Sequence, residues 1–295
     1  MMYKYRMEKH KKNIKITKIL KNKVILVTGG GGSIGSEIVK KILEYPVKTV
    51  RVLDTDEHGL FKLKRSTNDS RLRFLLGNIL DKERVNIAGK GVDIIIHAAA
   101  VKNIEITEFN AIETIDVNIN GTVNLIKMVI ENKPERFLYI STDKAADNST
   151  LYGTTKQIGE RLVRWAGNHV EDTKFGSVRF GNVIETRGNV FEVWNEEFKQ
   201  NKPLSITDPK MRRYFFHIHE AVDFSLECLT QMKEGEIFVP KMKHQSIKEL
   251  ALKISNKHKI IGLRPGEKIE EILMTNSEKQ IAIEKDKMWI IKNPF

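Results

Sequence analysis

A short stretch of the sequence gathers side chains that can transfer protons. It follows the apolar run 137–140, which is typical of a buried strand. A hydroxyl, a carboxyl, two amines and a phenol together supply acids, bases and hydrogen-bonding groups. Such groups meet at the end of a buried strand chiefly where chemistry occurs. The stretch is therefore predicted to be a catalytic centre, formed by Thr142, Asp143, Lys144, Tyr152 and Lys156.

Tyr152 and Lys156 have the spacing of neighbours on one helix face. A helix is expected from Tyr152 to about Ala166, and residues one turn apart on it lie side by side. An ammonium beside a phenol favours the phenolate, so Lys156 is predicted to lower the pKa of Tyr152 towards a value useful for a base. A tyrosine and a lysine four residues apart are common by chance. A catalytic role is favoured here because the pair follows the end of a buried strand.

The elements that must position these groups begin with a nucleotide-binding pattern. The apolar run 24–27 is typical of a central parallel strand, and a glycine-rich turn and a helical pattern follow it. This turn matches both G-x-G-x-x-G and the related pattern with glycines three apart. Only glycine lets the backbone approach a pyrophosphate, whose charge then lies at the helix N-terminus. The residues expected to contact the cofactor here are Gly29, Gly32, Ser33, Ile34 and Gly35.

The second expected strand ends at Asp54. An acid at this place binds the adenosine ribose hydroxyls and disfavours a 2′-phosphate, so Asp54 slightly favours NAD over NADP. The alternative is an aspartate that caps a helix or turn. Nearby basic residues, Lys62, Lys64 and Arg65, could weaken the preference for NAD. Further cofactor contacts are expected from the ends of the third and fourth strands and from the helix after them, at Asn78, Ile79, Ala98, Ala99, Lys102 and Asn118.

Strands that alternate with helices predict an α/β fold, a Rossmann-type doubly wound parallel sheet. Strands are expected at 72–76 and 93–97, the latter ending in His97, which is expected to face the cofactor or its neighbours. A long helix is expected from about Ala111 to Glu131. Its buried side would consist of Ile112, Ile115, Ile119, Val123 and Ile126. Asn118 lies within reach of that side and must be hydrogen-bonded there, either as a structural bridge or as part of a proton relay.

The predicted domain organisation has three parts. Residues 1–22 form a basic leader, which is interpreted as packing Ile14, Ile16, Ile19 and Leu20 on the body of the protein or on a neighbouring subunit, rather than binding nucleic acid or an anionic membrane. Residues 23–182 form an NAD(P)-binding Rossmann domain, to which 214–239 return. Residues 183–213 and 240–295 form a smaller, discontinuous substrate-binding lobe, in which arginines at 179, 187, 212, 213 and 264 suit a diphosphate.

Composition narrows the class of protein. The chain has 295 residues, of which 40% are hydrophobic, so a sizeable core is expected. The formal net charge of +12 is compatible with a phosphorylated small molecule as well as with nucleic acid. The single cysteine, Cys228, excludes an internal disulfide and suits a reducing, cytoplasmic location. With no run of about 20 apolar residues, membrane insertion is not expected, and neither a metal site nor nucleic-acid binding is predicted.

The later sequence blocks carry a family resemblance. The chain carries the blocks Ser-Thr-Asp-Lys-Ala at 141–145 and Leu-Tyr-Gly-Thr-Thr-Lys at 151–156, in addition to the glycine loop and Asn118. With them the chain resembles the extended short-chain dehydrogenases/reductases. More narrowly, it resembles their polysaccharide-biosynthesis branch, which includes the UDP-N-acetylglucosamine 4,6-dehydratases. Further matching blocks follow in the family's order at 178–183, 187–188, 207–209, 213–215, 220–222, 235–240 and 263–268.

The resemblance implies NAD(P)-dependent dehydration of a UDP-sugar, foremost UDP-N-acetylglucosamine, to a 4-keto-6-deoxy sugar for surface glycans, with or without inversion at C5. It implies a tightly bound cofactor and a homo-oligomer. In this reaction Tyr152 accepts the proton of the C4 hydroxyl and Thr142 or Ser141 holds that oxygen. Lys144 is the base at C5, and Asp143 protonates the departing C6 hydroxyl. Substrate contacts are expected from Lys102, Asn182, Arg187, Arg213, Arg264 and Glu267.

Other functions fit parts of the same sequence. A UDP-sugar 4-epimerase or 4-ketoreductase on the same fold does not need the pair Asp143 and Lys144, so this pair discriminates against both. A non-catalytic NAD(P)-sensing regulator would tolerate the loss of Tyr152 or Lys156, and both are present.

Thr55 stands where the 5-inverting members carry an arginine that selects NADP, which again favours NAD.

Overall fold

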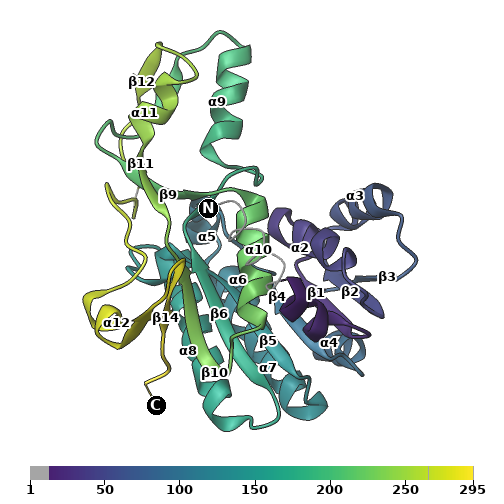
Figure 1. The fold of residues 1–295 in the computed structure, drawn as a ribbon. Helices are drawn as coiled ribbons and strands as arrows, with labels where there is room; N and C mark the ends of the chain where they lie inside the picture. The colour runs from purple at the N-terminus through teal and green to yellow at the C-terminus, as the bar shows by residue number, and fades with distance from the viewer. Residues whose placement is uncertain (1–12, 265, 295) are drawn as a thin grey trace.

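The computed structural model describes residues 13–264 and 266–294 (Figure 1). The expectations for residues 1–12 of the basic leader lie outside the described residues. Residues 13–20 are helical. Ile16 and Leu20 are buried in the main core beside Ile38 and Leu226, and Ile14 is exposed. This part of the leader therefore packs on the body of the protein.

The described residues form a nine-stranded central sheet with the strand order β13-β14-β10-β6-β5-β4-β1-β2-β3. Its parallel strands are β1 (Val24–Thr28), β2 (Thr49–Asp54), β3 (Leu72–Leu76), β4 (Ile94–His97), β5 (Arg136–Thr142), β6 (Lys174–Phe180) and β10 (Glu234–Pro240). The strand order reverses between β1 and β4. In open α/β sheets, ligands bind outside the carboxyl ends of the strands at such a switch point.

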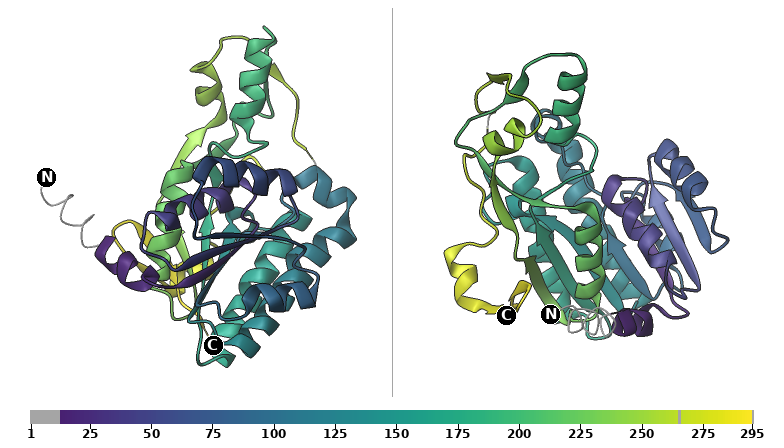
Figure 2. Two further views of the ribbon diagram at one scale, coloured as in Figure 1. Left: turned by 90° about the vertical axis from the view of Figure 1, so that its right-hand side faces the viewer. Right: turned by 45° about the horizontal axis from the view of Figure 1, so that its top comes forward.

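Helices cover both faces of this sheet (Figure 2). One face packs against residues 13–20, α2 (Ser33–Leu43), α3 (Glu57–Thr67) and α10 (Ile218–Leu229), which contains the buried Cys228. The other packs against α4 (Lys82–Gly89), α7 (Gly121–Asn132) and α8 (Leu151–His169). Along β1, Ile25 and Val27 contact the first layer and Leu26 the second. The strands are continuous apolar runs because both faces of the sheet are buried. The predicted doubly wound Rossmann fold is thereby confirmed.

The long helix predicted from Ala111 to Glu131 is broken in its middle. It consists of α6 (Ala111–Ile115), a π-helical turn (Asp116–Asn120) and α7, and α5 (Ile104–Phe109) precedes it. The wider π turn rotates the two halves relative to each other. As a result Ile112 and Ile115 are 74% and 40% exposed, although Ile126 is buried as predicted. The prediction of one continuous buried stripe was wrong because it assumed an unbroken α-helical period.

A smaller lobe projects from the main sheet at the top of Figure 1. One of its sheets contains β7 (Asn182–Val183), β9 (Arg212–Phe216) and β11 (Lys243–Ser246), and β8 (Leu204–Ile206) pairs with β12 (His258–Ile260). Helices α9 (Val190–Lys199) and α11 (Ile247–Leu252) complete it. Its own core consists of Trp194, Leu204, Ile206, Met211, Phe215, Ile247 and Ala251.

The C-terminal part of the segment 240–295 departs from its expected place in the lobe. After α12 (Asn276–Ile281), strand β13 (Ala282–Glu284) pairs with β14 (Met288–Ile291), and β14 pairs antiparallel with β10. These strands extend the main sheet and bury Ile291 against Ile237 and Val239. The pairing joins segments far apart in the chain, which a boundary drawn from local sequence blocks does not detect.

Candidate active site

The candidate catalytic residues meet where β5 ends. Thr142, the last residue of β5, is followed by a short 3-10 turn over Asp143–Ala145. The chain then reverses into α8, whose first turn is capped by Thr150, with Oγ1 accepting a hydrogen bond from the Gly153 amide at 3.1 Å. The reversal brings the start of α8 back against the end of the strand.

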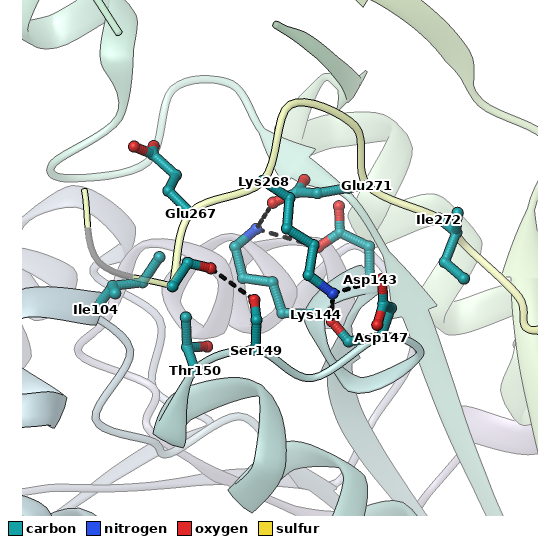
Figure 3. A pocket seen from close by; sticks show the side chains of 11 residues that line it. Ile104, Asp143, Lys144, Asp147, Ser149, Thr150, Glu267, Lys268, Glu271 and Ile272 are labelled. Carbon is teal, nitrogen blue, oxygen red and sulfur yellow. Dashed lines mark hydrogen bonds and ion pairs between the residues drawn. The ribbon is translucent and has the colours of Figure 1, made fainter. Parts of the chain in front are cut away.

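Asp143 and Lys144 form a charged cluster with a residue that the sequence reasoning missed, Glu271. Lys144 Nζ lies 3.2 Å from Asp143 Oδ1 and 2.9 Å from Glu271 Oε1, as the dashed lines in Figure 3 show. Asp143 Oδ1 also accepts a hydrogen bond from the Thr142 hydroxyl at 2.9 Å. Arg213 Nε lies 3.4 Å from Glu271 Oε1. Glu271 follows the block 263–268, and that proximity was its only signal in the sequence.

The cluster is buried, and its charges set the pKa values of its members. Burial and the neighbouring charge of Glu271 raise the pKa of Asp143. The pKa of Glu271 is held below its usual range by Lys144, Asp143 and Arg213, which together outweigh burial. The carboxyls of Asp143 and Glu271 likewise raise the pKa of Lys144 against the effect of burial. Lys144 is therefore an ammonium in this structure, placed between two carboxyl groups.

Lys156 is buried and Tyr152 is partly buried, but they do not form the predicted pair. Burial raises the pKa of Tyr152 to about 12, and the charge that opposes this rise is that of Lys144. Burial lowers the pKa of Lys156 to about 7, and its Nζ lies 4.0 Å from the centre of the Tyr139 ring. The prediction that Lys156 lowers the pKa of Tyr152 was wrong for this structure, because the Lys156 side chain packs on Tyr139.

Ser141 and Arg179 belong to a structural network rather than to the site. Ser141 Oγ donates to Glu160 Oε1 at 2.6 Å, so its hydroxyl does not contribute to the catalytic cluster. Arg179 is fully buried between Glu160 and Glu278, at 2.5 Å and 2.8 Å. Both interpretations, Ser141 as an oxygen holder and Arg179 as a diphosphate ligand, are corrected. Glu160 on α8 and Glu278 on α12 therefore occupy the hydrogen-bonding groups of these two residues.

The glycine loop has the close packing that a dinucleotide site requires. Gly29 has a φ of +70°, and a Cβ there would lie 2.5 Å from the Ala99 amide nitrogen. A Cβ at Gly35 would lie 2.1 Å from the Gly29 carbonyl oxygen. Helix α2 begins after Gly32 with no side-chain cap and no acidic residue in its first turn. The open amides at this N-terminus fit a pyrophosphate.

Asp54 and Arg187 meet at the same loop. Asp54 accepts hydrogen bonds from the amides of Gly31 and Asp56 at 2.7 and 2.9 Å. The Arg187 guanidinium donates to the Gly31 carbonyl at 3.0 Å and to Asp56 at 3.1 Å, and its amide donates to Ser33 Oγ. Lys102 Nζ donates to the Arg187 carbonyl at 3.1 Å. Arg187 therefore lies at the expected cofactor loop, which differs from its predicted place among the substrate contacts.

The remaining expected cofactor residues line the ends of the neighbouring strands. Asn118 is buried and bridges both backbone groups of Val101 and the hydroxyl of Thr155, which is the structural alternative of its two predicted roles. Ile79 is buried against Gly121, and Asn78 closes a turn by accepting from the Leu80 amide. His97 is buried between Thr28 and Thr122, and burial lowers its pKa to about 3, so it is neutral.

A loop over 266–272 covers the catalytic cluster (Figure 3). Arg213 is buried and donates to the carbonyls of Lys268 and Ile269, and Lys268 Nζ pairs with Asp147. Glu267 accepts from the Arg264 amide, and Arg264 lies 3.5 Å from Glu105 on α5. Asn182 lies 3.5 Å from Glu271. The pocket beneath this loop is lined by Ile104, Asp143, Lys144, Asp147, Ser149, Thr150, Gly266, Glu267, Lys268, Glu271 and Ile272 (Figure 3).

The described residues contain neither a metal-binding cluster nor a helix that could span a membrane. In residues 13–264 and 266–294, no cluster of His, Cys, Asp or Glu side chains has the arrangement of a metal site. Within the same ranges, every helix is too short or too polar to cross a membrane.

Several known proteins are similar to this chain. A family model described as "Polysaccharide biosynthesis protein" matches residues 25–293. An uncharacterized membrane protein of Methanocaldococcus jannaschii is 40% identical, over 94% of this chain and 87% of its own. A UDP-N-acetylglucosamine 4,6-dehydratase (inverting) of Campylobacter jejuni is 36% identical, over 91% and 82%. A UDP-glucose 4-epimerase of Rickettsia bellii is 33% identical, over 87% and 79%.

Among solved structures, Pen from Bacillus thuringiensis superposes with a TM-score of 0.89 at 34% identity, covering 94% of this chain and 90% of its own. The matched range of the family model includes the glycine loop, the cluster at Asp143 and the covering loop. The resemblance expected from the sequence is thereby confirmed. The chain belongs to the polysaccharide biosynthesis protein family, on the fold of the extended short-chain dehydrogenases/reductases.

Proposed function

We propose that this protein removes water from a UDP-sugar, foremost UDP-N-acetylglucosamine, to form the 4-keto-6-deoxy sugar for surface-glycan biosynthesis. The observation that carries the proposal is the contact of Asp143 with Lys144 at 3.2 Å, beside the partly buried Tyr152. An elimination needs one group to take a proton and another to protonate the leaving hydroxyl. An amine and a carboxyl in contact supply both.

Tyr152 and Thr142 would act at the sugar's C4 hydroxyl. Tyr152 accepts its proton, and the Thr142 hydroxyl holds its oxygen at the end of β5. The pKa of about 12 makes the phenol a reluctant base, and Lys144 is the charge that favours its ionised form. NAD(P), when bound, supplies the acceptor for hydride from C4 and the donor of hydride to C6.

Lys144 and Asp143 would then carry out the elimination. The ketone at C4 makes the C5 proton acidic, and neutral Lys144 accepts it. The electron pair of the C5–H bond forms the C5=C6 double bond. The C6–O bond breaks, and its oxygen takes the proton of Asp143 and leaves as water. The return of a proton to C5 from the same face retains its configuration, and return from the opposite face inverts it.

Lys144 needs a neutral form for this step, and the geometry offers one. A proton that crosses the 2.9 Å contact from Lys144 to Glu271 leaves a neutral amine beside a protonated Asp143. A buried site that excludes water disfavours separated charges, which helps this exchange once a sugar fills the pocket. The product of the exchange has the acid and the base in the required protonation states.

The residues present fit an NAD(P) cofactor. The pyrophosphate would lie on the open amides of Ser33 and Ile34, at the start of α2. Lys156 would hold the nicotinamide ribose, and Asp54 the adenosine ribose with a slight preference for NAD. The Arg187 guanidinium, which contacts Gly31 and Asp56, would offset the preference for NAD because it places a cation near the 2′-position of the adenosine ribose, where NADP carries a phosphate.

The test is NMR of the purified protein with UDP-N-acetylglucosamine in deuterated water. A 4-keto-6-deoxy product with deuterium at C5 supports dehydration, and its C5 configuration shows whether the sugar is inverted. Inversion at C4 with the C6 hydroxyl retained would sink the dehydratase proposal and establish the second candidate, a UDP-sugar 4-epimerase. The relative named as an epimerase favours that second candidate, whereas Asp143 and Lys144 have no task in it.

A homo-oligomer is also proposed. On α5 and α6, Phe109 and Ile112 are 89% and 74% exposed, and Ile106 is half exposed beside them. Apolar side chains gathered on one face are typical of a protein interface. Light scattering of the wild type and of Phe109→Lys tests this, and a monomeric wild type at high concentration would contradict it.

A further inference from the structure

Two carboxyl groups share one pocket in this site. Asp143 and Glu271 both contact Lys144 Nζ, and their side chains lie within hydrogen-bond reach of each other. They come from different elements, Asp143 from the turn after β5 and Glu271 from the covering loop. Both are shielded from solvent, with exposed side-chain fractions of 0% and 11%. Two buried carboxylates at this separation repel each other strongly, so one of them must hold a proton.

The surroundings decide which carboxyl is ionised. Glu271 Oε1 contacts both cations of the site, Lys144 at 2.9 Å and Arg213 at 3.4 Å, and its Oε2 lies 3.5 Å from the Asn182 amide nitrogen. Arg213 is itself fixed through the carbonyls of Lys268 and Ile269. Asp143 contacts one cation, Lys144, at the longer distance of 3.2 Å. Glu271 is therefore the better stabilised anion.

A buried oxygen of Asp143 points to the same assignment. Asp143 Oδ2 has no hydrogen-bond partner among the described residues, although Oδ1 has two. A buried carboxylate oxygen without a donor is costly. A proton on Asp143 removes that cost and turns the repulsive contact with Glu271 into a hydrogen bond.

We propose that Glu271 is a positioning residue that keeps Asp143 protonated, as the ionised member of a carboxyl pair that shares one proton. The inference rests on the proposed function for its chemical meaning, because protonated Asp143 is the acid that the elimination requires. The other titratable groups facing Asp143 are Lys144 on its own turn, Tyr152 on α8 and Tyr214 on β9. Burial and Glu271 raise the pKa of Asp143 more than Lys144 lowers it.

Infrared difference spectroscopy tests the shared proton without any substrate. A protonated carboxyl gives a carbonyl band that a carboxylate lacks. At neutral pH we expect this band in the wild type and its loss in both Asp143→Asn and Glu271→Gln. The matched control is Glu270→Gln, which makes the same change at the neighbouring exposed position and should keep the band. The inference would be overturned if the Asp143→Asn spectrum lacked no band that the wild type shows. It would also be overturned if the band persisted in Glu271→Gln.

The pH profile of product formation tests the catalytic consequence. Removing the charge of Glu271 lets Asp143 ionise at lower pH, so in Glu271→Gln the alkaline limb of kcat should move towards acid. At neutral pH kcat should fall about 100-fold, the usual contribution of a general acid. The KM for the UDP-sugar should change far less. An equal fall at all pH values would show a merely structural role and overturn the inference.

The two experiments separate this inference from the proposed function. If the wild type gives the infrared band but no 4-keto-6-deoxy product, the carboxyl pair stands and the proposed function fails. If the wild type gives the product and Glu271→Gln keeps both the band and the pH profile, the proposed function stands and the inference about Glu271 fails.

Discussion

Lys144 Nζ lies 2.9 Å from Glu271 Oε1, so a loop far along the chain holds the residue proposed as the base at C5. The contact is short, buried and charge-assisted, and such contacts are strong. It stabilises Lys144 as an ammonium. A sugar that enters the pocket must therefore compete with Glu271 for Lys144. The loop that carries Glu271 is expected to affect catalysis for this reason.

Replacement of Lys144 tests its role as the base. Lys144→Gln should lower kcat for the 4-keto-6-deoxy product by about 100-fold or more, because among the described residues Lys144 is the amine that contacts Asp143. Deuterium should no longer enter C5, as measured by NMR. Lys127→Gln, at an exposed position of α7, is the control and should behave as the wild type. Normal deuterium incorporation in Lys144→Gln would remove Lys144 from the mechanism.

The variants Ser141→Ala and Thr142→Val distinguish the roles of two adjacent hydroxyl groups. Ser141 donates to the buried Glu160, so Ser141→Ala should lower the free energy of unfolding by about 1–2 kcal/mol and leave kcat nearly unchanged. Thr142→Val should instead lower kcat by at least about 10-fold with little loss of stability. Urea denaturation and steady-state kinetics measure the two effects. The opposite pattern would return Ser141 to the catalytic centre.

Lys156 should weaken the folded protein, and the effect should depend on pH. Its pKa is about 7 when folded and about 10.5 when unfolded, because burial disfavours the charged form. The unfolded state therefore binds the proton more tightly. The resulting loss of stability is complete below about pH 7 and disappears as pH rises towards 10.5.

Lys156→Met removes this penalty. At about pH 7 its free energy of unfolding, measured by urea denaturation without added cofactor, should exceed that of the wild type by roughly 2–4 kcal/mol. The gain should shrink at about pH 10, and turnover should be lost. A variant that is less stable than the wild type at neutral pH would show that the contact with Tyr139 outweighs burial of the charge.

Arg187→Gln distinguishes cofactor binding from substrate binding. Because its guanidinium contacts Gly31 and Asp56, the KM for the nicotinamide cofactor should rise about 10-fold and the KM for the UDP-sugar should stay within about 2-fold. Arg264→Gln should show the reverse, since Arg264 lies at the loop over the pocket. If Arg187→Gln raises only the KM for the sugar, the role predicted from the sequence is correct after all.

The fold and the core of the candidate site follow from local sequence. The runs 24–27 and 137–140 become β1 and β5 because apolar residues on both faces of a strand require helices on both sides. The glycine spacing indicates a close turn, and the structure packs Gly29 and Gly35 without room for a Cβ. The cluster from Thr142 to Lys156 lies within one strand, one turn and one helix. The positions of these groups along the chain therefore follow from short-range patterns, whereas the contacts between their side chains do not.

Glu271, the partners of Lys156 and the place of Arg187 could not be predicted, and each depends on contacts between distant segments. The loop over 266–272 is held at the site by contacts with distant segments, among them those of Arg213 on β9 with Lys268 and Ile269, and β13 joins the main sheet through β14. The sequence by itself determined which chemical groups the site contains and where its strands end. The tertiary structure decided which of those groups touch, because burial and neighbouring charge arise only when the chain is packed, and they set which group holds a proton.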